Sequence, residues 1–208
     1  MKILLVAATE MEIKPFLETN SSTDYLICGV GMPATIYHLT KKLLNEKYEL
    51  IIQAGIAGTF SKKIKKGEIV FVEQDVFADI GVEEKKKFKS LFDLGFAKEN
   101  EFPYKNGWLI NTSDISSSMQ IKKVKAVTVN KISDRKKQTR QLKQIFNAAI
   151  ESMEGAAFHY VCLQQQIPFL QLRSISNKVG ERDKTKWEIK ESIENLNKEL
   201  IKIIEALQ

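Results

Sequence analysis

Acidic side chains that follow apolar runs are the residues of this sequence best placed to do chemistry. Glu10 and Glu12 follow the run at residues 2–8, in the segment TEME, and Glu154 begins a predicted helix in the segment ESMEGAAFHY. Carboxylates can accept hydrogen bonds from ligand hydroxyls and can serve as general acids or bases. Small residues at 155–157 leave little bulk beside Glu154. Acids in the first turn of a helix are also favoured by the helix dipole, so each glutamate has a structural explanation of its own.

Polar and glycine-rich loops follow three other apolar runs. The segment GVGMPAT follows residues 25–30, GIAGTF follows 50–55, and SNKVGERDKTKW follows 169–176. Ligands of open α/β sheets bind beyond the carboxyl ends of the strands, so these loops and the two acidic segments are expected to meet at one site. The GVG segment alone is a weak signal, because tight turns after strands need glycine with or without a ligand.

The elements that would carry these residues are strands alternating with helices. Short, continuously apolar runs predict central strands covered on both faces, at 2–8, 25–30, 50–55, 68–74, 124–129 and 169–176. Stretches of helical period predict helices at 10–18, 33–46, 135–147, 154–166 and 187–207. The predicted fold class is therefore α/β. Residues 76–120 show no clear period and are interpreted as loops and short strands, with a lid as an alternative.

The composition predicts one compact domain over residues 1–208. A hydrophobic content of 43% is enough for one core, and the chain is too short to expect two domains. No apolar run is long enough to cross a membrane and the start does not resemble a signal peptide, so a cytoplasmic location is expected. The net charge of +6 comes from scattered lysines and four arginines without interleaved aromatic residues, a pattern that disfavours a nucleic-acid surface.

The sequence indicates neither a metal site nor an organic cofactor. Cys28 and Cys162 lie in apolar surroundings without metal-ligand spacing and are predicted to be buried free thiols. His38 and His159 lie on predicted helices with no third ligand nearby, so both are interpreted as packing or surface residues.

Four segments together resemble the purine nucleoside phosphorylase and methylthioadenosine nucleosidase superfamily. These are ESMEGAAFHYVC, PFLQLRSISN, TEME and QAGIAGTF, and the resemblance spans nearly the whole chain, weakest over 76–120. It implies a three-layer α/β/α domain with a central mixed twisted sheet, and a homodimer. The ending RSISNKVGERDKTKW and the short chain are most similar to the futalosine hydrolases. That similarity implies hydrolysis of a 6-oxopurine nucleoside, futalosine, to hypoxanthine and dehypoxanthine futalosine in the alternative menaquinone pathway.

The resemblance implies a role for each of five residues. Glu154 corresponds to the glutamate that binds the ribose hydroxyls, and Met153 to the methionine beside the sugar. Glu12 corresponds to the acid that positions the attacking water. Asn177 occupies the position of the aspartate that contacts the base in adenine-cleaving members. Asp79, by resemblance alone, could reach the far end of a long substrate.

These roles agree with the chemistry of an N-glycosidic bond. Its cleavage leaves positive charge on the sugar and negative charge on the base, so a catalyst needs acceptors at one end and donors at the other. Glu12 and Glu154 supply the acceptors, and Asn177 supplies a donor. Gly155 and Ala156 would then let the sugar approach the start of the helix, although close packing of that helix would also favour them.

Three departures from the family pattern narrow the substrate and the nucleophile. Asn177 replaces the aspartate of adenine-specific members, and an amide donor suits the O6 carbonyl of a 6-oxopurine such as hypoxanthine. Ile56, followed by Ala57, replaces the serine or threonine with which phosphorolytic relatives hold phosphate, so these two residues are expected to line a site that uses water. Ser152 replaces a glutamate of many nucleosidases and leaves the sugar contacts less defined.

Two further residues keep two interpretations each. Val129 ends the run 124–129 and either packs on the base or belongs to the core. Arg182, with Asp183, either closes over the substrate or caps the last helix.

Rival functions also follow from the sequence. Two share the fold: a purine nucleoside phosphorylase and a methylthioadenosine/adenosylhomocysteine nucleosidase. A third, from another class, is a nucleoside-binding protein without turnover. The product distinguishes them: hydrolysis forms free sugar, phosphorolysis forms a sugar 1-phosphate, and binding alone forms neither.

Overall fold

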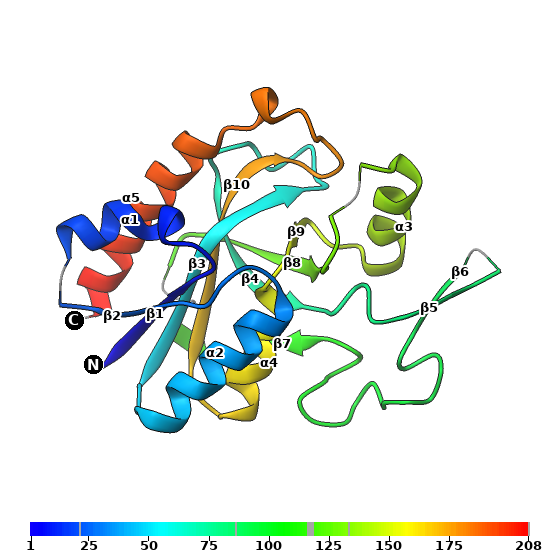
Figure 1. Cartoon of the computed structure of the whole chain (residues 1–208), viewed down its shortest axis with the longest axis horizontal. Coiled ribbons are helices and arrows are strands. Elements are labelled where there is room, and N and C mark those ends of the chain that lie inside the picture. Colours follow the sequence, from blue (N-terminus) through cyan, green and yellow to red (C-terminus); the bar gives the residue numbers. More distant parts are fainter. Residues whose placement is uncertain (21, 86, 116–118, 133, 208) are drawn as a thin grey trace.

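A mixed β-sheet forms the centre of the molecule (Figure 1). The computed structural model describes residues 1–20, 22–85, 87–115, 119–132 and 134–207. Within them, eight strands form the sheet, in the order β10-β4-β8-β9-β3-β1-β2 with β7 paired to β4. The strands are β1 (Ile3–Ala7), β2 (Asp24–Ile27), β3 (Leu50–Thr59), β4 (Ile69–Asp75), β7 (Leu109–Ile110), β8 (Lys122–Thr128), β9 (Ile150–Ser152) and β10 (Phe169–Lys178).

The long strand β3 makes the sheet close on itself. It pairs in parallel with β1 on one side and with β10 on the other, while its last residues, Gly58 and Thr59, pair antiparallel with β9. Strands β10, β4, β8 and β9 complete the circuit back to β3. A register shift between Ile175 and Asn177 bends the end of β10. The closure therefore brings the ends of β3, β9 and β10 together.

Helices cover both faces of the sheet around β1 and β3 (Figure 1). On one face lie α1 (Glu10–Thr19) and α5 (Ile189–Leu207), and on the other α2 (Met32–Asn45) and α4 (Gly155–Gln164). The apolar run of β1 serves both faces, because Leu5 packs with α1 and α5 while Leu4 packs with α2 and α4. The predicted three-layer α/β/α class with a mixed sheet is confirmed.

A buried amide connects the last helix to the turn that carries Glu12. Asn197, on α5, donates a hydrogen bond from Nδ2 to the carbonyl of Glu12 and accepts one at Oδ1 from the backbone N–H of Phe16. An α-helix would ordinarily pair those two backbone groups with each other. Pro15 lies between them and interrupts the regular pattern of α1. Asn197 thus satisfies backbone groups of α1 from a neighbouring helix.

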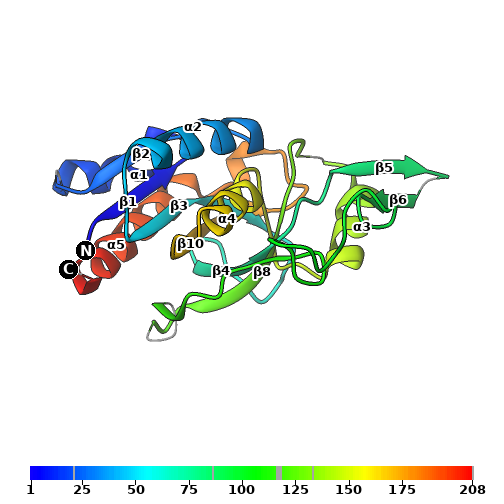
Figure 2. The same ribbon diagram turned by 90° about the horizontal axis from the view of Figure 1, so that it is seen from below.

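The other elements differ from expectation mainly in the middle of the chain. Strands β5 (Gly81–Glu84) and β6 (Lys87–Ser90) form a hairpin that projects from one end of the molecule (Figure 2). Helix α3 (Lys136–Phe146) lies on the expected segment, and Lys184–Lys186 forms a 3₁₀ turn. Strand β9 was not predicted. Residues 86 and 116–118 of the segment interpreted as loops and short strands lie outside the described residues. No helix in the described ranges has the length and apolarity needed to cross a membrane.

Candidate active site

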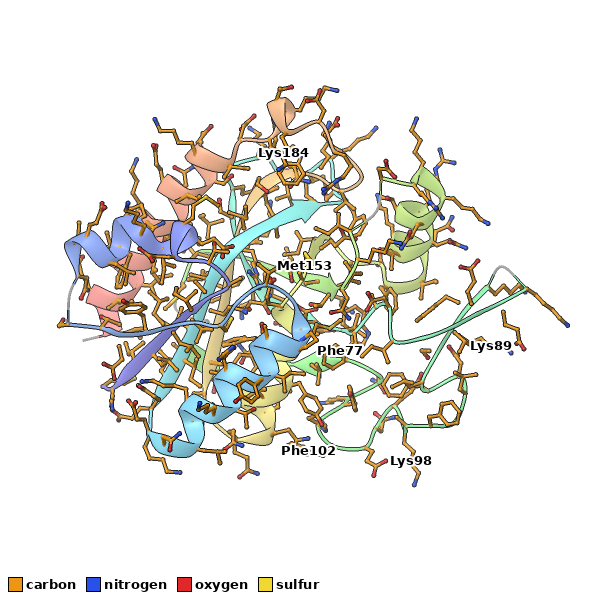
Figure 3. The ribbon with its side chains drawn as sticks, in the orientation of Figure 1. Phe77, Lys89, Lys98, Phe102, Met153 and Lys184 are labelled. Carbon is orange, nitrogen blue, oxygen red and sulfur yellow. The ribbon has the colours of Figure 1, made fainter. Side chains whose placement is uncertain are left out.

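One cavity of about 200 Å³ opens where β1, β3, β9 and β10 end. Its lining includes seven of the residues predicted to form the site: Glu12, Ile56, Ala57, Ser152, Met153, Glu154 and Asn177. Figure 3 shows Met153 near the centre of the molecule. The predicted convergence of strand ends therefore occurs in the structure for β1, β3 and β10, and also for β2, because Val30 of the loop that follows it lines the cavity.

Glu12 is held by three hydrogen bonds. Thr9, the residue before α1, donates its backbone N–H and its hydroxyl to Oε2 at 3.0 and 3.1 Å. The backbone N–H of Ile56, on β3, donates to Oε1 at 3.0 Å. A carboxylate has about four lone-pair sites, so roughly one remains for a ligand or water in the cavity.

Glu154 is tied to the start of α2. Its Oε1 accepts a hydrogen bond of 3.0 Å from the backbone N–H of Gly31, where φ is +92° and glycine is favoured. Its Oε2 lies 3.9 Å from Nη2 of Arg173. Burial raises the pKa of Glu154, and the guanidinium of Arg173 opposes that rise.

Arg173 is the main site component that the sequence interpretation missed. Its side chain is 1% exposed, and Nη2 donates to Oε1 of Gln53 at 2.8 Å. A Cβ on Gly55 would overlap Nη1 of Arg173 and lie 2.8 Å from Oε1 of Glu12. The bare glycine thus lets Arg173 reach the region between the two carboxylates. An arginine inside an apolar strand was the available signal, because arginine is rarely buried without partners.

Asn177 has a defined amide orientation. Its Oδ1 accepts from the hydroxyl of Ser176 at 2.8 Å, and its Nδ2 donates to the carbonyl of Lys178 at 2.9 Å. A carbonyl cannot donate, so this contact fixes which end of the amide carries the hydrogens. One amide hydrogen and one lone pair of Oδ1 remain for a ligand.

Ser152 has its hydroxyl among buried polar groups, although it lines the cavity. Its Oγ accepts from the backbone N–H of Gly155 at 3.3 Å and lies 3.5 Å from the hydroxyl of Thr128. Thr128 in turn donates to Asp75 at 2.8 Å. Burial raises the pKa of Asp75 to about 6. Ser152 therefore joins the start of α4 to this interior cluster.

The small residues after Glu154 pack against buried groups of the interior. A Cβ on Gly155 would overlap Oδ2 of Asp75 and Nε2 of Gln171, which lie under the start of α4. Ala156 is fully buried, and its backbone N–H donates to Thr128 at 2.8 Å. These contacts support the helix-packing interpretation of Gly155 and Ala156, and neither residue lines the cavity.

Three predicted site residues do not line this cavity. Val129 is 1% exposed and packs in a core cluster with Leu142 and Ala148, next to a second cavity that it shares with Asp79. Asp79 accepts from the backbone N–H of Asn130 at 2.6 Å.

Arg182 lies 5.5 Å from the ring centre of Trp187, which does line the candidate site. Its neighbour Asp183 caps the 3₁₀ turn Lys184–Lys186 through Thr185, whereas the capping alternative named the last helix, which begins at Ile189.

The cysteines and His159 are buried, as the sequence predicts. Cys28 and Cys162 are free thiols. His159 has Nδ1 3.1 Å from the carbonyl of Leu109, and burial lowers its pKa to about 3. His38 lies on the exposed side of α2 beside the ring of Tyr37. Among the described residues, no group of three or more His, Cys, Asp or Glu could hold a metal ion.

Comparison with known proteins decides the family. Residues 3–208 match the family described as the phosphorylase superfamily. The chain belongs to this superfamily. Among curated members, it is 29% identical to a futalosine hydrolase of Thermus thermophilus, an alignment that covers 93% of this chain and 91% of the relative. It is 24% identical to an aminodeoxyfutalosine nucleosidase of Campylobacter jejuni, with 88% of each chain covered.

Solved structures of the superfamily have the same fold. A futalosine hydrolase of Helicobacter pylori superposes with a TM-score of 0.80 at 18% identity and covers 99% of this chain and 98% of that chain. A methylthioadenosine/S-adenosylhomocysteine nucleosidase of Colwellia psychrerythraea, solved with adenine, gives 0.82 at 20% identity, with 100% and 96% covered. At these identities the likeness concerns the fold.

Proposed function

We propose that this chain is an N-glycosyl hydrolase of 6-oxopurine nucleosides, with futalosine as the favoured substrate. The observation that carries the proposal is that Glu12, Glu154 and Asn177, from three distant parts of the sequence, line one cavity. The relatives named as futalosine hydrolases, whose alignments cover most of the chain, support the same substrate class.

Glu154 binds the sugar and stabilises the positive charge that develops on it. A buried carboxylate that accepts hydrogen bonds from both ribose hydroxyls places negative charge next to the ring as oxocarbenium character develops. The backbone N–H of Gly31 and the guanidinium of Arg173 hold this carboxylate in place, so it needs little reorganisation during the reaction.

The nucleophile is positioned by Glu12. Three of its lone-pair sites are taken by Thr9 and Ile56, and the remaining one can accept a proton from a water molecule in the cavity. Arg173 lies against the same region and adds positive charge that favours a hydroxide-like water.

Water fits this cavity better than phosphate. Ile56 directs its backbone N–H to Glu12, so that donor is not available to an anion. Arg173 already contacts Gln53 and Glu154. Among the described residues that line the cavity, none is lysine or arginine, whereas phosphate recognition usually uses such side chains.

Base release from futalosine and inosine, with and without phosphate, tests the proposal. We expect free sugar as the product and a rate that does not depend on phosphate. Glu12→Gln should lower kcat by roughly 10² to 10⁴ and leave hypoxanthine affinity nearly unchanged, because the loss is that of a general base. Asp183→Asn, outside the cavity, is the control. A sugar 1-phosphate product would indicate a phosphorylase. Faster cleavage of methylthioadenosine than of futalosine would indicate a methylthioadenosine nucleosidase. Binding of the nucleoside without release of the base would indicate a non-catalytic protein.

We also infer that residues 1–208 fold as one domain and that the chain forms a homodimer. The single domain is supported by pairing of β3 with strands from both ends of the sequence.

The homodimer is supported by an apolar groove along α2, where Ile36, Tyr37 and Leu44 are 36%, 61% and 72% exposed. The groove begins at Met32, next to the Gly31 that holds Glu154. A cytoplasmic location stays a prediction.

A further inference from the structure

One carboxyl group in the cavity has no part in the reaction described above. Glu151, on β9, lines the cavity and is 7% exposed. In the described part of the chain, its side chain makes no hydrogen bond or ion pair within contact distance. The carboxyl group faces the cavity, so a ligand group placed there can pair with it and offset the cost of its partial burial.

The sheet places Glu151 and Asn177 on the two strands that flank Gly58. Glu151 is directly opposite Gly58 in the antiparallel pair of β9 and β3, and side chains at such positions point to the same face with their Cβ atoms about 4.5–5.5 Å apart. On the other side of β3, Asn177 is the partner of Gly58, and its Nδ2 lies 3.3 Å from where a Cβ of Gly58 would be. The carboxylate and the amide therefore lie on either side of a residue that has no side chain.

The charges around Glu151 leave it able to ionise near neutral pH. Burial and, to a smaller extent, the negative charge of Asp79 raise its pKa, Arg182 opposes them, and the resulting pKa is about 7. Glu12, Glu154 and Arg173 are the other charged groups of the site. Asp79 and Arg182 do not line the cavity, but they influence its charge because they shift the pKa of Glu151.

We propose that Glu151 determines base specificity by accepting the N1–H of a 6-oxopurine while Asn177 donates its free amide hydrogen to O6. The inference rests on the proposed function and deepens it. A 6-oxopurine presents a donor at N1 next to an acceptor at O6, which complements a carboxylate next to an amide N–H. A 6-aminopurine presents the opposite pattern, an acceptor at N1 and a donor at the amino group. It would leave Glu151 facing a lone pair, and the Lys178 carbonyl prevents Asn177 from reversing its amide without losing a hydrogen bond.

Binding of free bases to the full chain tests this proposal without requiring turnover. Titration calorimetry would use hypoxanthine, adenine and 1-methylhypoxanthine, which lacks the N1–H, with wild type, Glu151→Gln and the control Glu73→Gln. Glu73 is an exposed strand glutamate outside the cavity. We expect Glu151→Gln to weaken hypoxanthine binding about 10- to 100-fold and to lower the hypoxanthine-to-adenine affinity ratio at least about 10-fold, as for loss of a charge-assisted hydrogen bond. The control should leave both affinities unchanged.

The methylated base separates this role from a general effect on the cavity. 1-Methylhypoxanthine should bind wild type at least about 10-fold more weakly than hypoxanthine, and Glu151→Gln should change its affinity by less than about 3-fold. An affinity ratio unchanged in Glu151→Gln, or equal binding of the two 6-oxopurines to wild type, would overturn the proposal, and the second result needs no variant to fold. If hypoxanthine binds as expected but no nucleoside is cleaved, the proposed function fails while the assignment of Glu151 stands.

Discussion

At the scale of single residues, the cavity combines carboxylates in different electrostatic settings. Glu12 accepts three hydrogen bonds and Glu154 faces Arg173, whereas Glu151 is buried without such a contact in the described structure. An uncompensated carboxyl destabilises the empty protein and is available to a ligand. Stability and specificity should therefore respond in opposite directions when Glu151 is changed.

The pH dependence of stability tests the cost of burying Glu151. Its pKa is raised from 4.5 to about 7 on folding, so between these values the folded chain binds more protons and stability falls as pH rises. Glu151→Gln should raise the free energy of unfolding at pH 8 by about 1–3 kcal/mol more than at pH 5. Urea denaturation of the ligand-free protein measures this difference. Glu73→Gln should show none, and a Glu151→Gln effect equal at both pH values would contradict the assigned burial cost.

At the scale of elements, the position of Glu12 depends on contact between α1 and α5. Pro15 interrupts the hydrogen-bond pattern of α1 directly after the turn that carries Glu12, and Asn197 supplies partners for the backbone groups there. The first turn of α1 is therefore supported by a helix from the other end of the sequence.

Asn197→Ala tests this support. The change leaves the Glu12 carbonyl and the Phe16 N–H without their buried partner and should lower the free energy of unfolding by about 1–3 kcal/mol. Because Glu12 moves with that turn, kcat should fall more than hypoxanthine affinity does. Asn195→Ala is a matched control, since Asn195 donates to the carbonyl of Gly67, away from α1. Equal loss of kcat in the two variants would argue against a positioning role for Asn197.

At the scale of the whole molecule, the apolar groove on α2 adjoins the candidate active-site cavity through residues 30–32. A second copy seated there would cover the exposed side chains Tyr37 and Leu44. It would also fix the start of α2, whose backbone holds Glu154. Assembly and activity should therefore be linked.

The oligomeric state of wild type and variants tests whether the groove on α2 is the dimer interface. Light scattering should give about twice the 23.7 kDa chain mass for wild type, and Leu44→Lys should shift the protein toward the monomer at micromolar concentration, because a charge would enter an apolar contact. Ile145→Lys, at a side chain of α3 that is 52% exposed, should not change the mass. A dimer that is unaffected by Leu44→Lys would show that the second copy binds at another surface. A wild-type monomer would show that no dimer forms.

Local pattern was sufficient for much of the fold and part of the site. The apolar run of β1 and the helical period of the segment 187–207, which forms α5, predict buried elements because burial imposes a period on the sequence itself. Strand β9 escaped prediction because three residues without alternation carry little signal. Gly155 was open to two interpretations because a small residue looks the same in sequence whether it faces a ligand or Asp75.

The sequence by itself determined the α/β class, the superfamily resemblance and the residue types Glu12, Glu154 and Asn177 at strand ends. Only the tertiary structure decided that Arg173 lies near both Glu12 and Glu154 and that Glu151 stands across Gly58 from Asn177. These relations depend on the register of β3 with β9 and β10 and on the bulge at the end of β10. Register is a property of pairings between segments far apart in the chain, so no local pattern of residues encodes it.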